Sequence, residues 1–276
     1  MIKISNLSFS YGSKSVLKNI SMELSDGGIY GLLGENGVGK TTLLTLLAGL
    51  KKPKMGWISV DGAAPSDRLP SMLSDMYYLP DEVAPVRAKA SDFASETGVF
   101  YPRFSKEKFL EIMAEFETDP LQRMDTMSAG QLKKTYIAFA LATGVKHYLM
   151  DEPTNGLDIP SKTQFRKAVM RHTPDDSILV ISTHQVRDLE DIIDPVIILD
   201  REEVLLNASL QQISDKLFFD YGREIRPEAL YLEQTPGGCI QVYPNTGDKE
   251  SKVNLEALFN TVHKHKELVS SMFNTK

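Results

Sequence analysis

The chain has a single residue that could form a disulfide and no segment that could cross a membrane as a helix. Cys239 is the one cysteine among 276 residues, so an internal disulfide is excluded. No apolar run approaches the ~20 residues that a transmembrane helix requires. Met1 leads directly into a strand-like pattern without the apolar core of a signal peptide. We therefore expect a cytoplasmic protein whose contact with any membrane is made through a partner.

Positive charge is also in short supply, because 31 Lys and Arg residues stand against 37 Asp and Glu residues for a net charge of −6. A broad nucleic-acid-binding face needs clustered positive charge, so we expect no nucleic-acid partner. The apolar fraction of 42% and the charged fraction of 25% are ordinary for a soluble globular protein. The length suits one large domain, or a domain with an extension.

What the chain does contain is a glycine-rich loop at residues 34–42 that matches the pattern G-x-x-x-x-G-K-[ST]. Backbone N–H groups in such a loop turn inward around phosphates, Lys40 reaches the β and γ phosphates, and Thr41 is placed to hold Mg²⁺. The apolar run at 29–33 predicts a buried strand before the loop, and 42–48 predicts a helix whose N-terminus faces the phosphates. The residues expected to bind a nucleotide triphosphate here are Gly34, Glu35, Asn36, Gly37, Val38, Gly39, Lys40, Thr41 and Thr42.

Two acids follow a second predicted strand, residues 148–150. Asp151 could hold Mg²⁺ opposite Thr41, directly or through water, and Glu152 could orient and deprotonate a water aimed at the γ-phosphate. Paired acids at a strand end are also common as plain turn residues, but the phosphate loop on the same predicted sheet favours catalysis. His184 follows the strand 178–181, where ligands bind in parallel sheets, although a lone histidine is more often structural.

A second candidate anion site lies at residues 127–131, which open a predicted helix. Ser128 and Gly130 at a helix start offer free N–H groups and the positive end of the helix dipole. Simple N-capping by Ser128 is the alternative. The chain thus has two candidate phosphate sites and one complete nucleotide loop. We expect two chains to pair head to tail, so that each completes the site of the other.

In their order and spacing these motifs resemble the ATPase subunit of ATP-binding cassette (ABC) transporters, over about residues 1–210. The resemblance implies ATP and Mg²⁺ as ligands, with Lys40, Glu152 and His184 as catalytic residues. It implies that Tyr11 stacks on adenine and that the loop 155–158, with Asp158, reaches across a dimer. It also implies that the ATP of the partner chain is contacted by the signature residues Ser128, Ala129, Gly130 and Gln131.

Three positions depart from the family pattern. Met127 replaces a leucine, which conserves volume. Ala129 replaces a glycine, so we expect an ordinary backbone there and not a positive φ. Asp81 stands where the family usually has a glutamine that contacts Mg²⁺ or water and touches the membrane subunit. An aspartate can still bind Mg²⁺ or water, but it adds negative charge to this coupling loop.

The order of predicted elements and the resemblance together indicate an α/β P-loop NTPase. We expect a parallel sheet core, an N-terminal antiparallel β subdomain, an inserted α-helical subdomain at about 86–143, and a small α+β C-terminal extension. The ATPase domain is predicted to cover residues 1–208 and the extension residues 209–276. The insert carries aromatic residues that either pack its own small core or line a groove for the membrane subunit: Phe93, Phe100, Tyr101, Phe104, Phe109 and Phe116.

In the extension, the sequence around Pro236-Gly237-Gly238 predicts a β-hairpin between 231–233 and 240–243. One amphipathic helix is predicted to follow, with apolar positions from Leu255 to Val269 on a single face. We expect this module to have a regulatory or dimer-supporting role and no part in the chemistry. A purely structural cap over the ATPase domain is the alternative.

The function favoured by the sequence is the ATP-hydrolysing subunit of an ABC transporter, working on the cytoplasmic face of the cell membrane. Its partners would be a separate integral membrane permease and a second ABC ATPase chain, identical or different. The stretch at 100–104 and the extra C-terminal module favour an exporter. A soluble ABC ATPase without a transport role, such as an iron–sulfur assembly factor, remains an alternative. Glu152 and His184 argue against a non-catalytic member of a heterodimer.

Overall fold

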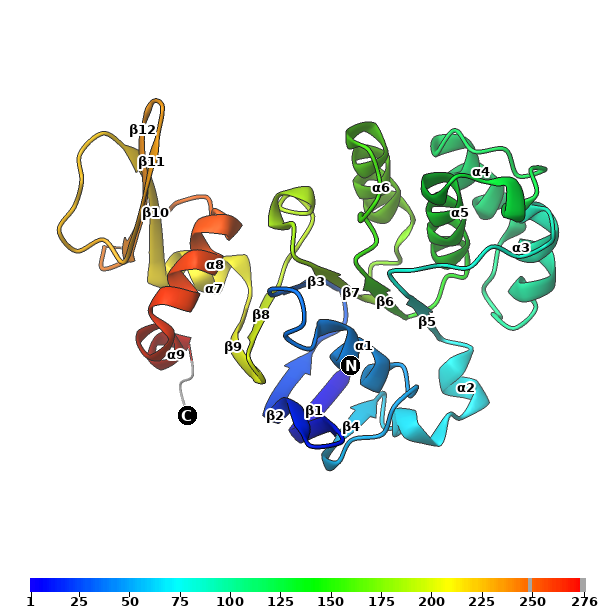
Figure 1. Cartoon of the computed structure of the whole chain (residues 1–276), viewed down its shortest axis with the longest axis horizontal. Helices are drawn as coiled ribbons and strands as arrows, with labels where there is room; N and C mark the ends of the chain where they lie inside the picture. The colour runs from blue at the N-terminus through cyan, green and yellow to red at the C-terminus, as the bar shows by residue number, and fades with distance from the viewer. Residues whose placement is uncertain (248–249, 274–276) are drawn as a thin grey trace.

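A six-stranded sheet forms the centre of the protein (Figure 1), of which this computed structural model describes residues 1–247 and 250–273. Its strand order is β5-β6-β7-β3-β8-β9. The strands are β5 (Met76–Leu79), β6 (His147–Asp151), β7 (Ile178–Thr183), β3 (Gly28–Leu33), β8 (Val196–Asp200) and β9 (Glu203–Ala208). Every residue of β6, β7 and β8 is buried, as expected for parallel strands covered on both faces.

The last strand of this sheet differs from the prediction of a parallel core. The first five strands pair in parallel, but β9 pairs antiparallel with β8. Only Arg201 and Glu202 separate the two strands, and a connection this short can join antiparallel strands alone. The antiparallel edge therefore follows from a hairpin that the apolar pattern did not reveal.

The predicted N-terminal antiparallel subdomain is confirmed as a second sheet with the order β2-β1-β4. Its strands are β1 (Ile2–Tyr11), β2 (Lys14–Leu24) and β4 (Met55–Val60). Helix α1 (Lys40–Leu47) follows the glycine-rich loop and lies between this sheet and the central one (Figure 1). All four leucines of α1 are buried, as in a helix enclosed on every side.

Helices cover the opposite face of the central sheet (Figure 1), and the first three of them form the predicted helical insert. They are α3 (Ala90–Gly98), α4 (Lys106–Glu115), α5 (Ala129–Ala142) and α6 (Ile159–His172). Short turns of helix connect them and the neighbouring strands: η1 (Pro65–Asp67), α2 (Pro70–Leu73), η2 (Met124–Thr126) and η3 (Val186–Asp188).

The aromatic residues of the insert mostly pack its own core. Phe109 and Phe116 are buried, and the rings of Phe93, Tyr101 and Phe104 surround Phe139 at centroid distances of 5.1, 5.9 and 5.5 Å. Phe100 differs, because 71% of its surface is exposed. The core interpretation therefore accounts for five of the six aromatic residues named from the sequence.

The C-terminal extension contains more structure than the sequence indicated. Its elements are α7 (Leu210–Lys216), β10 (Leu217–Gly222), β11 (Tyr231–Thr235), β12 (Gly238–Pro244), α8 (Leu255–Lys264) and α9 (Lys266–Phe273). The β11–β12 hairpin is confirmed, and β10 adds a third strand beside β12. The single predicted helix is two helices, because the backbone of His265 leaves the helical region (φ −127°, ψ 48°).

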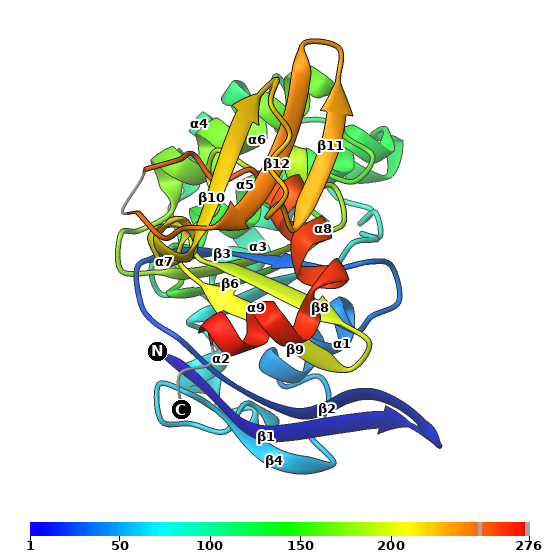
Figure 2. The same cartoon turned by 90° about the vertical axis from the view of Figure 1, so that its left-hand side faces the viewer.

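The extension packs directly on the edge of the central sheet, where α9 lies against β9 (Figure 2). One cluster of buried apolar side chains runs from Leu33 in the central sheet to Val269 in α9. In the part of the chain that the structure describes, every helix is too short or too polar to traverse a lipid bilayer.

Candidate active site

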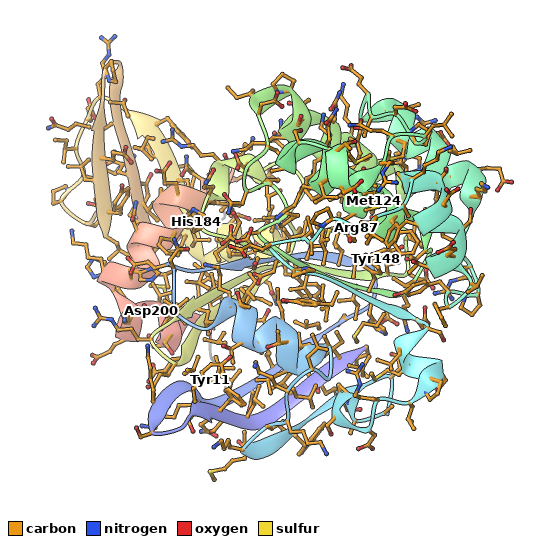
Figure 3. The ribbon with its side chains drawn as sticks, turned by 45° about the vertical axis from the view of Figure 1, so that its right-hand side comes forward. Tyr11, Arg87, Met124, Tyr148, His184 and Asp200 are labelled. Atoms are coloured by element: carbon orange, nitrogen blue, oxygen red, sulfur yellow. The ribbon has the colours of Figure 1, made fainter. Side chains whose placement is uncertain are left out.

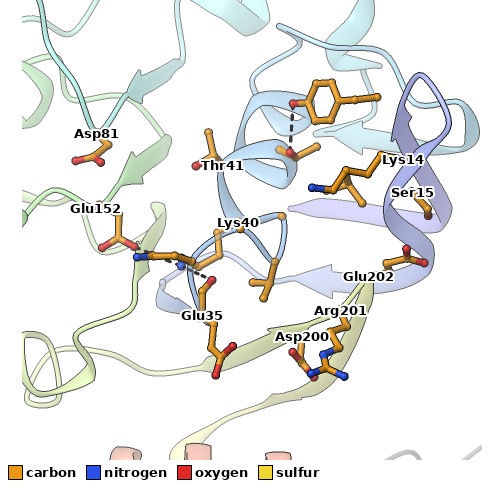
Figure 4. Close-up of a pocket in the computed structure, with 17 residues that line it drawn as sticks. Lys14, Ser15, Glu35, Lys40, Thr41, Asp81, Glu152, Asp200, Arg201 and Glu202 are labelled. Carbon is orange, nitrogen blue, oxygen red and sulfur yellow. Dashed lines mark hydrogen bonds and ion pairs between the residues drawn. The ribbon is translucent and has the colours of Figure 1, made fainter.

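A cavity of about 720 Å³ opens at the carboxyl ends of the central strands, around the glycine-rich loop (Figure 4). Tyr11 and the β1–β2 hairpin form one side, Asp81 and Glu152 another, and residues 200–202 of the β8–β9 turn a third. Loop residues 35–42 form the floor. A nucleotide is expected in such a crevice of an α/β sheet.

Two glycines of the loop have positions that a larger residue could not occupy. Gly39 caps α1 with a φ of 114°, which L-residues rarely adopt. A Cβ on Gly34 would lie only 2.5 Å from the carbonyl oxygen of Leu199 at the end of β8. The glycine spacing therefore reflects backbone geometry, and it brings the loop into direct contact with β8.

Lys40 is buried with its ammonium group inside the loop. Its Nζ donates to the carbonyl oxygens of Gly34 at 2.8 Å and Glu35 at 3.1 Å, and it lies 3.4 Å from Oε1 of Glu152 (Figure 4). These partners are neutral dipoles and one carboxylate, so the cation is held at the mouth of the loop. A phosphate bound in the loop could accept a charge-assisted hydrogen bond from this ammonium group.

Glu152 and His184 lie together beside Lys40. Oε2 of Glu152 is 3.0 Å from Nδ1 of His184, and Oε1 of Glu152 is buried without a hydrogen-bond partner. Glu152 also has a φ of 45°, a conformation that a non-glycine residue retains only where its surroundings enforce it. The structure therefore brings together all three residues that the sequence analysis named as catalytic.

Asp151 is buried at the end of β6, where the Ser182 hydroxyl donates to its carboxylate at 2.5 Å. The same hydroxyl accepts a hydrogen bond from the backbone of Glu152 at 3.0 Å. Thr41 lines the cavity at the start of α1. A carboxylate and a hydroxyl are the oxygen ligands that Mg²⁺ prefers, so these residues fit a magnesium site by the chemistry of their donors.

The Tyr11 ring borders the cavity and is 48% exposed. The Tyr11 hydroxyl lies 3.3 Å from Oγ1 of Thr42. Phe9 packs edge-on against the Tyr11 ring, and Nζ of Lys51 is 5.0 Å from the centroid of that ring.

Burial, followed by the charges of Asp151 and Asp81, raises the pKa of Tyr78 to about 12. Tyr78 therefore stays a neutral phenol behind the site at physiological pH.

Asp81 does not project as a free charge. Its Oδ1 is 3.2 Å from Nζ of Lys133 on α5, whose side chain is buried, and it accepts hydrogen bonds from Nδ2 of Asn155 at 3.2 and 3.4 Å. Lys133 also donates to the backbone oxygen of Asp81. The negative charge that distinguishes this chain from the family pattern is thus paired within the same chain.

The signature residues lie outside the lining of the nucleotide cavity of their own chain. Ser128 caps α5 by accepting from the backbone of Gln131 at 3.2 Å, and the Gln131 side chain accepts from the backbone of Ser128 at 3.0 Å. Ala129 is the first helical residue, so the expectation of an ordinary backbone is confirmed. Ser128 and Ala129 are exposed, and the nucleotide cavity is lined without Ser128, Ala129, Gly130 or Gln131.

Asp158 also has a local structural role. It caps α6 by accepting from the backbone of Ser161 at 2.9 Å, and this interaction lowers the pKa of Asp158. Its side chain is exposed at the surface. The role of Asp158 across a dimer stays a prediction.

Sequence reasoning missed Lys133 and the β8–β9 turn. The strand before this turn ends in Asp200, an acid at the end of a fully buried strand, as Asp151 is. That signal was present in the sequence but was not used. Lys133 could have been found as a single lysine on a helix face that is otherwise buried and apolar.

The chain is similar to known proteins in both sequence and fold. A family model described as "ABC transporter" matches residues 17–155. The chain is 30% identical over 223 residues to the cobalt import ATP-binding protein CbiO of Salmonella typhimurium, covering 76% of this chain and 81% of CbiO. It is 28% identical over 224 residues to the SkfA peptide export ATP-binding protein SkfE of Bacillus subtilis, covering 78% of this chain and 92% of SkfE.

Among solved structures, the fold resembles a dimeric post-hydrolysis state of the ATP-binding cassette MJ0796 bound to ADP and Pi, with a TM-score of 0.67. The two are 22% identical, and the likeness covers 76% of this chain and 99% of the other.

Proposed function

Because this chain belongs to the ABC transporter family, as an ATP-binding subunit that hydrolyses ATP, we propose that it powers a separate membrane permease through a dimer that sandwiches ATP. The observation that carries the proposal is the convergence of Lys40, Glu152 and His184 at the mouth of the phosphate loop. Similar chains serve both import and export, as the names of CbiO and SkfE show. We propose export, on the strength of the exposed Phe100 and the C-terminal module.

In the proposed reaction, Lys40 and the loop N–H groups bind the β and γ phosphates while the Tyr11 ring supports the adenine. Glu152 accepts a proton from a water molecule while the oxygen of that water attacks the γ-phosphorus. The bond between the γ-phosphorus and the β–γ bridging oxygen then breaks to give ADP and phosphate. His184 holds Glu152 and donates to a γ-phosphate oxygen. Thr41 and Asp151 would hold Mg²⁺, which neutralises charge on the phosphates when bound.

The dimer follows from the position of the signature residues. Ser128 and Gly130 lie at the N-terminus of α5, the positive end of a helix dipole, where the capping box uses the N–H groups of Ser128 and Gln131. The cavity around Lys40 is lined without them. A second chain, identical or different, would present its own Ser128 equivalent to this cavity, and the γ-phosphate would join the two chains.

The proposal is tested with a tagged Glu152→Gln chain purified from solubilised host membranes in Mg²⁺-ATP. Glutamine keeps the shape of Glu152 but accepts no proton, so hydrolysis should fall by about 10²–10⁴. ATP should then persist and shift the population toward dimer, since the bridging phosphate exists only there. A membrane protein should purify with the dimer.

Three controls separate the parts of the proposal. Mg²⁺-ADP should give monomer, Lys40→Ala should lose ATP binding, and Ser128→Arg added to Glu152→Gln should abolish the dimer. A Glu152→Gln chain that hydrolyses ATP at the wild-type rate would remove Glu152 from the mechanism. Recovery of the ATP-bound dimer without any membrane protein would favour the soluble, non-transport ATPase instead.

A further inference from the structure

Two helices of the C-terminal extension contact segments of the ATP site, one that lines the cavity and one that follows the histidine paired with Glu152. One contact is at the β8–β9 turn and the other is at the segment that follows His184. In Figure 3, Asp200 and His184 both lie on the side of the molecule that faces these helices. The inference below rests on the proposed function and concerns how its site is held in shape.

The first contact is an ion pair between a buried carboxylate, Asp200, and a lysine whose side chain is 40% exposed, Lys266. The Asp200 side chain is 5% exposed, and Nζ of Lys266, at the start of α9, donates to its Oδ2. Nε2 of His263 on α8 lies 3.8 Å from Oδ1 of the same carboxylate. A buried carboxylate needs such partners, because leaving it unpaired is strongly unfavourable. Among the described residues, the ion pairs of Asp200 are all with the extension.

Asp200 is the last residue of β8, and together with the β8–β9 turn it forms one side of the ATP cavity (Figure 4). The carbonyl of Leu199, next to it, makes the close approach to Gly34 that excludes a Cβ there. Arg201 and Glu202 have φ values of 39° and 80°, so this turn has little freedom to relax. The backbone of Lys18 donates to Glu202 at 2.9 Å and ties the turn to the β1–β2 hairpin.

The second contact is between α8 and η3, the short helical turn that follows the catalytic His184 in the chain. Arg187 donates to Glu256 of α8 at 2.6 Å, and a cavity of about 500 Å³ between these elements is bordered by His184 and Phe259. Arg187 is three residues from His184, which lies 3.0 Å from Glu152. This pair is exposed, so we expect it to act on the geometry of the loop more than on stability.

From these contacts we infer that Lys266 and Glu256 are positioning residues for the ATPase site. Lys266 holds the β8–β9 turn against the phosphate loop and so sets ATP affinity. Glu256 holds the segment after His184 and so sets the rate of the chemical step. The module that the sequence analysis expected to have no part in the chemistry thus acts on it indirectly, through geometry.

The test of Lys266 compares the full-length Lys266→Met and Lys266→Arg chains with Lys264→Met, an exposed lysine at the end of α8. We expect Lys266→Met to raise the KM for ATP about fivefold or more with a smaller effect on kcat. The conservative Lys266→Arg variant should restore KM, and Lys264→Met should match wild type. Should Lys266→Met fold poorly, Asp200→Asn/Lys266→Met removes both charges, leaves none unpaired, and should still raise KM.

The test of Glu256 is a charge exchange with a kinetic readout. Glu256→Arg should lower kcat with little change in KM, and Arg187→Glu/Glu256→Arg should restore it, while Glu267→Arg on the exposed side of α9 should have no effect. The inference would be overturned if the folded Asp200→Asn/Lys266→Met chain had the wild-type KM and the Glu256→Arg chain had the wild-type kcat. That outcome would leave the proposed function intact. ATP binding that survives Lys40→Ala would instead contradict the proposed function.

Discussion

At the scale of single residues, the fold pairs the ionisable groups that it buries. Lys40 is paired with Glu152, Lys133 with Asp81, and Asp200 with Lys266. Each pair joins segments that are distant in the sequence. Lys40 and Glu152 are both buried, so removing one of them costs roughly 3–5 kcal/mol because the remaining charge stays desolvated. The site therefore depends on the rest of the fold for its charge balance.

His147 is a buried residue of this kind whose charge depends on pH. Its Nε2 lies 2.8 Å from Oδ2 of Asp61, yet burial lowers the pKa of His147 from the usual 6.5 in spite of that carboxylate. Burial alone would raise the pKa of Asp61, but hydrogen bonds from the N-terminal ammonium and His147 outweigh it and lower that pKa. The folded state thus favours neutral His147 beside a charged Asp61.

This environment predicts a loss of stability in mild acid. The unfolded chain binds a proton at His147 near pH 6.5, where the folded chain does not. Stability is therefore complete above that pH and falls as pH drops toward the folded pKa. The unfolding temperature should decrease between about pH 7.5 and about pH 5. His147→Gln keeps a donor for Asp61 without titrating, so it should flatten this dependence; an equally steep dependence in that variant would exclude His147 as the cause.

At the scale of elements, two helices begin with the same capping arrangement but differ in what they face. Ser128 with Gln131 caps α5, and Ser209 with Gln212 caps α7. In both, the serine accepts from a backbone N–H and the glutamine accepts from the backbone of the serine. Substituting each serine in turn can therefore distinguish the structural role of a helix cap from a role in binding ATP.

Ser128→Ala and Ser209→Ala should each lower the free energy of unfolding by about 1 kcal/mol, because each leaves a helix donor without its cap. Only Ser128→Ala should also weaken the ATP-dependent dimer of Glu152→Gln chains, since its hydroxyl would contact the γ-phosphate of the partner. Chemical denaturation and light scattering measure the two effects. Equal dimerisation by both alanine variants would reduce Ser128 to a helix cap.

At the scale of the whole molecule, the predicted division at residues 208 and 209 crosses one continuous apolar cluster. Leu206 of β9, Ile213 of α7 and Val269 of α9 belong to the same buried cluster as Leu33 beside the phosphate loop. The extension begins a new set of elements at this point, but its core does not begin there. A shared core makes independent folding of residues 209–276 unfavourable.

We therefore expect differential scanning calorimetry of the whole chain to show one cooperative unfolding transition. Mg²⁺-ATP at about 100 times its dissociation constant should stabilise the folded state by about 2.7 kcal/mol and shift the entire transition upward. The Glu152→Gln chain is used so that ATP persists during the scan. Two transitions, one of which keeps the same midpoint temperature with and without ATP, would show that the extension unfolds as a separate unit.

Much of the fold and of the loop chemistry could be predicted from local patterns. The glycine spacing of residues 34–42, the apolar strands that end in Asp151 and Glu152, and the histidine after β7 all specify local backbone and strand ends. Parallel strands place such ends along one edge of a sheet, so short-range signals suffice to assemble Lys40, Glu152 and His184.

Other features were decided by contacts between segments far apart in the sequence. The pairing of Asp81 with Lys133 and the contacts of Asp200 with Lys266 each join residues whose own neighbours carry no sign of the partner. Periodicity reports which face of an element is buried, but it does not report what covers that face. Local sequence patterns were therefore enough to predict an ATP site and its reacting groups. The contacts of α8 and α9 with the β8–β9 turn and with the segment after His184 were visible only in the tertiary structure. The packing of these helices is set by shape and charge across the whole molecule, which no local pattern reports.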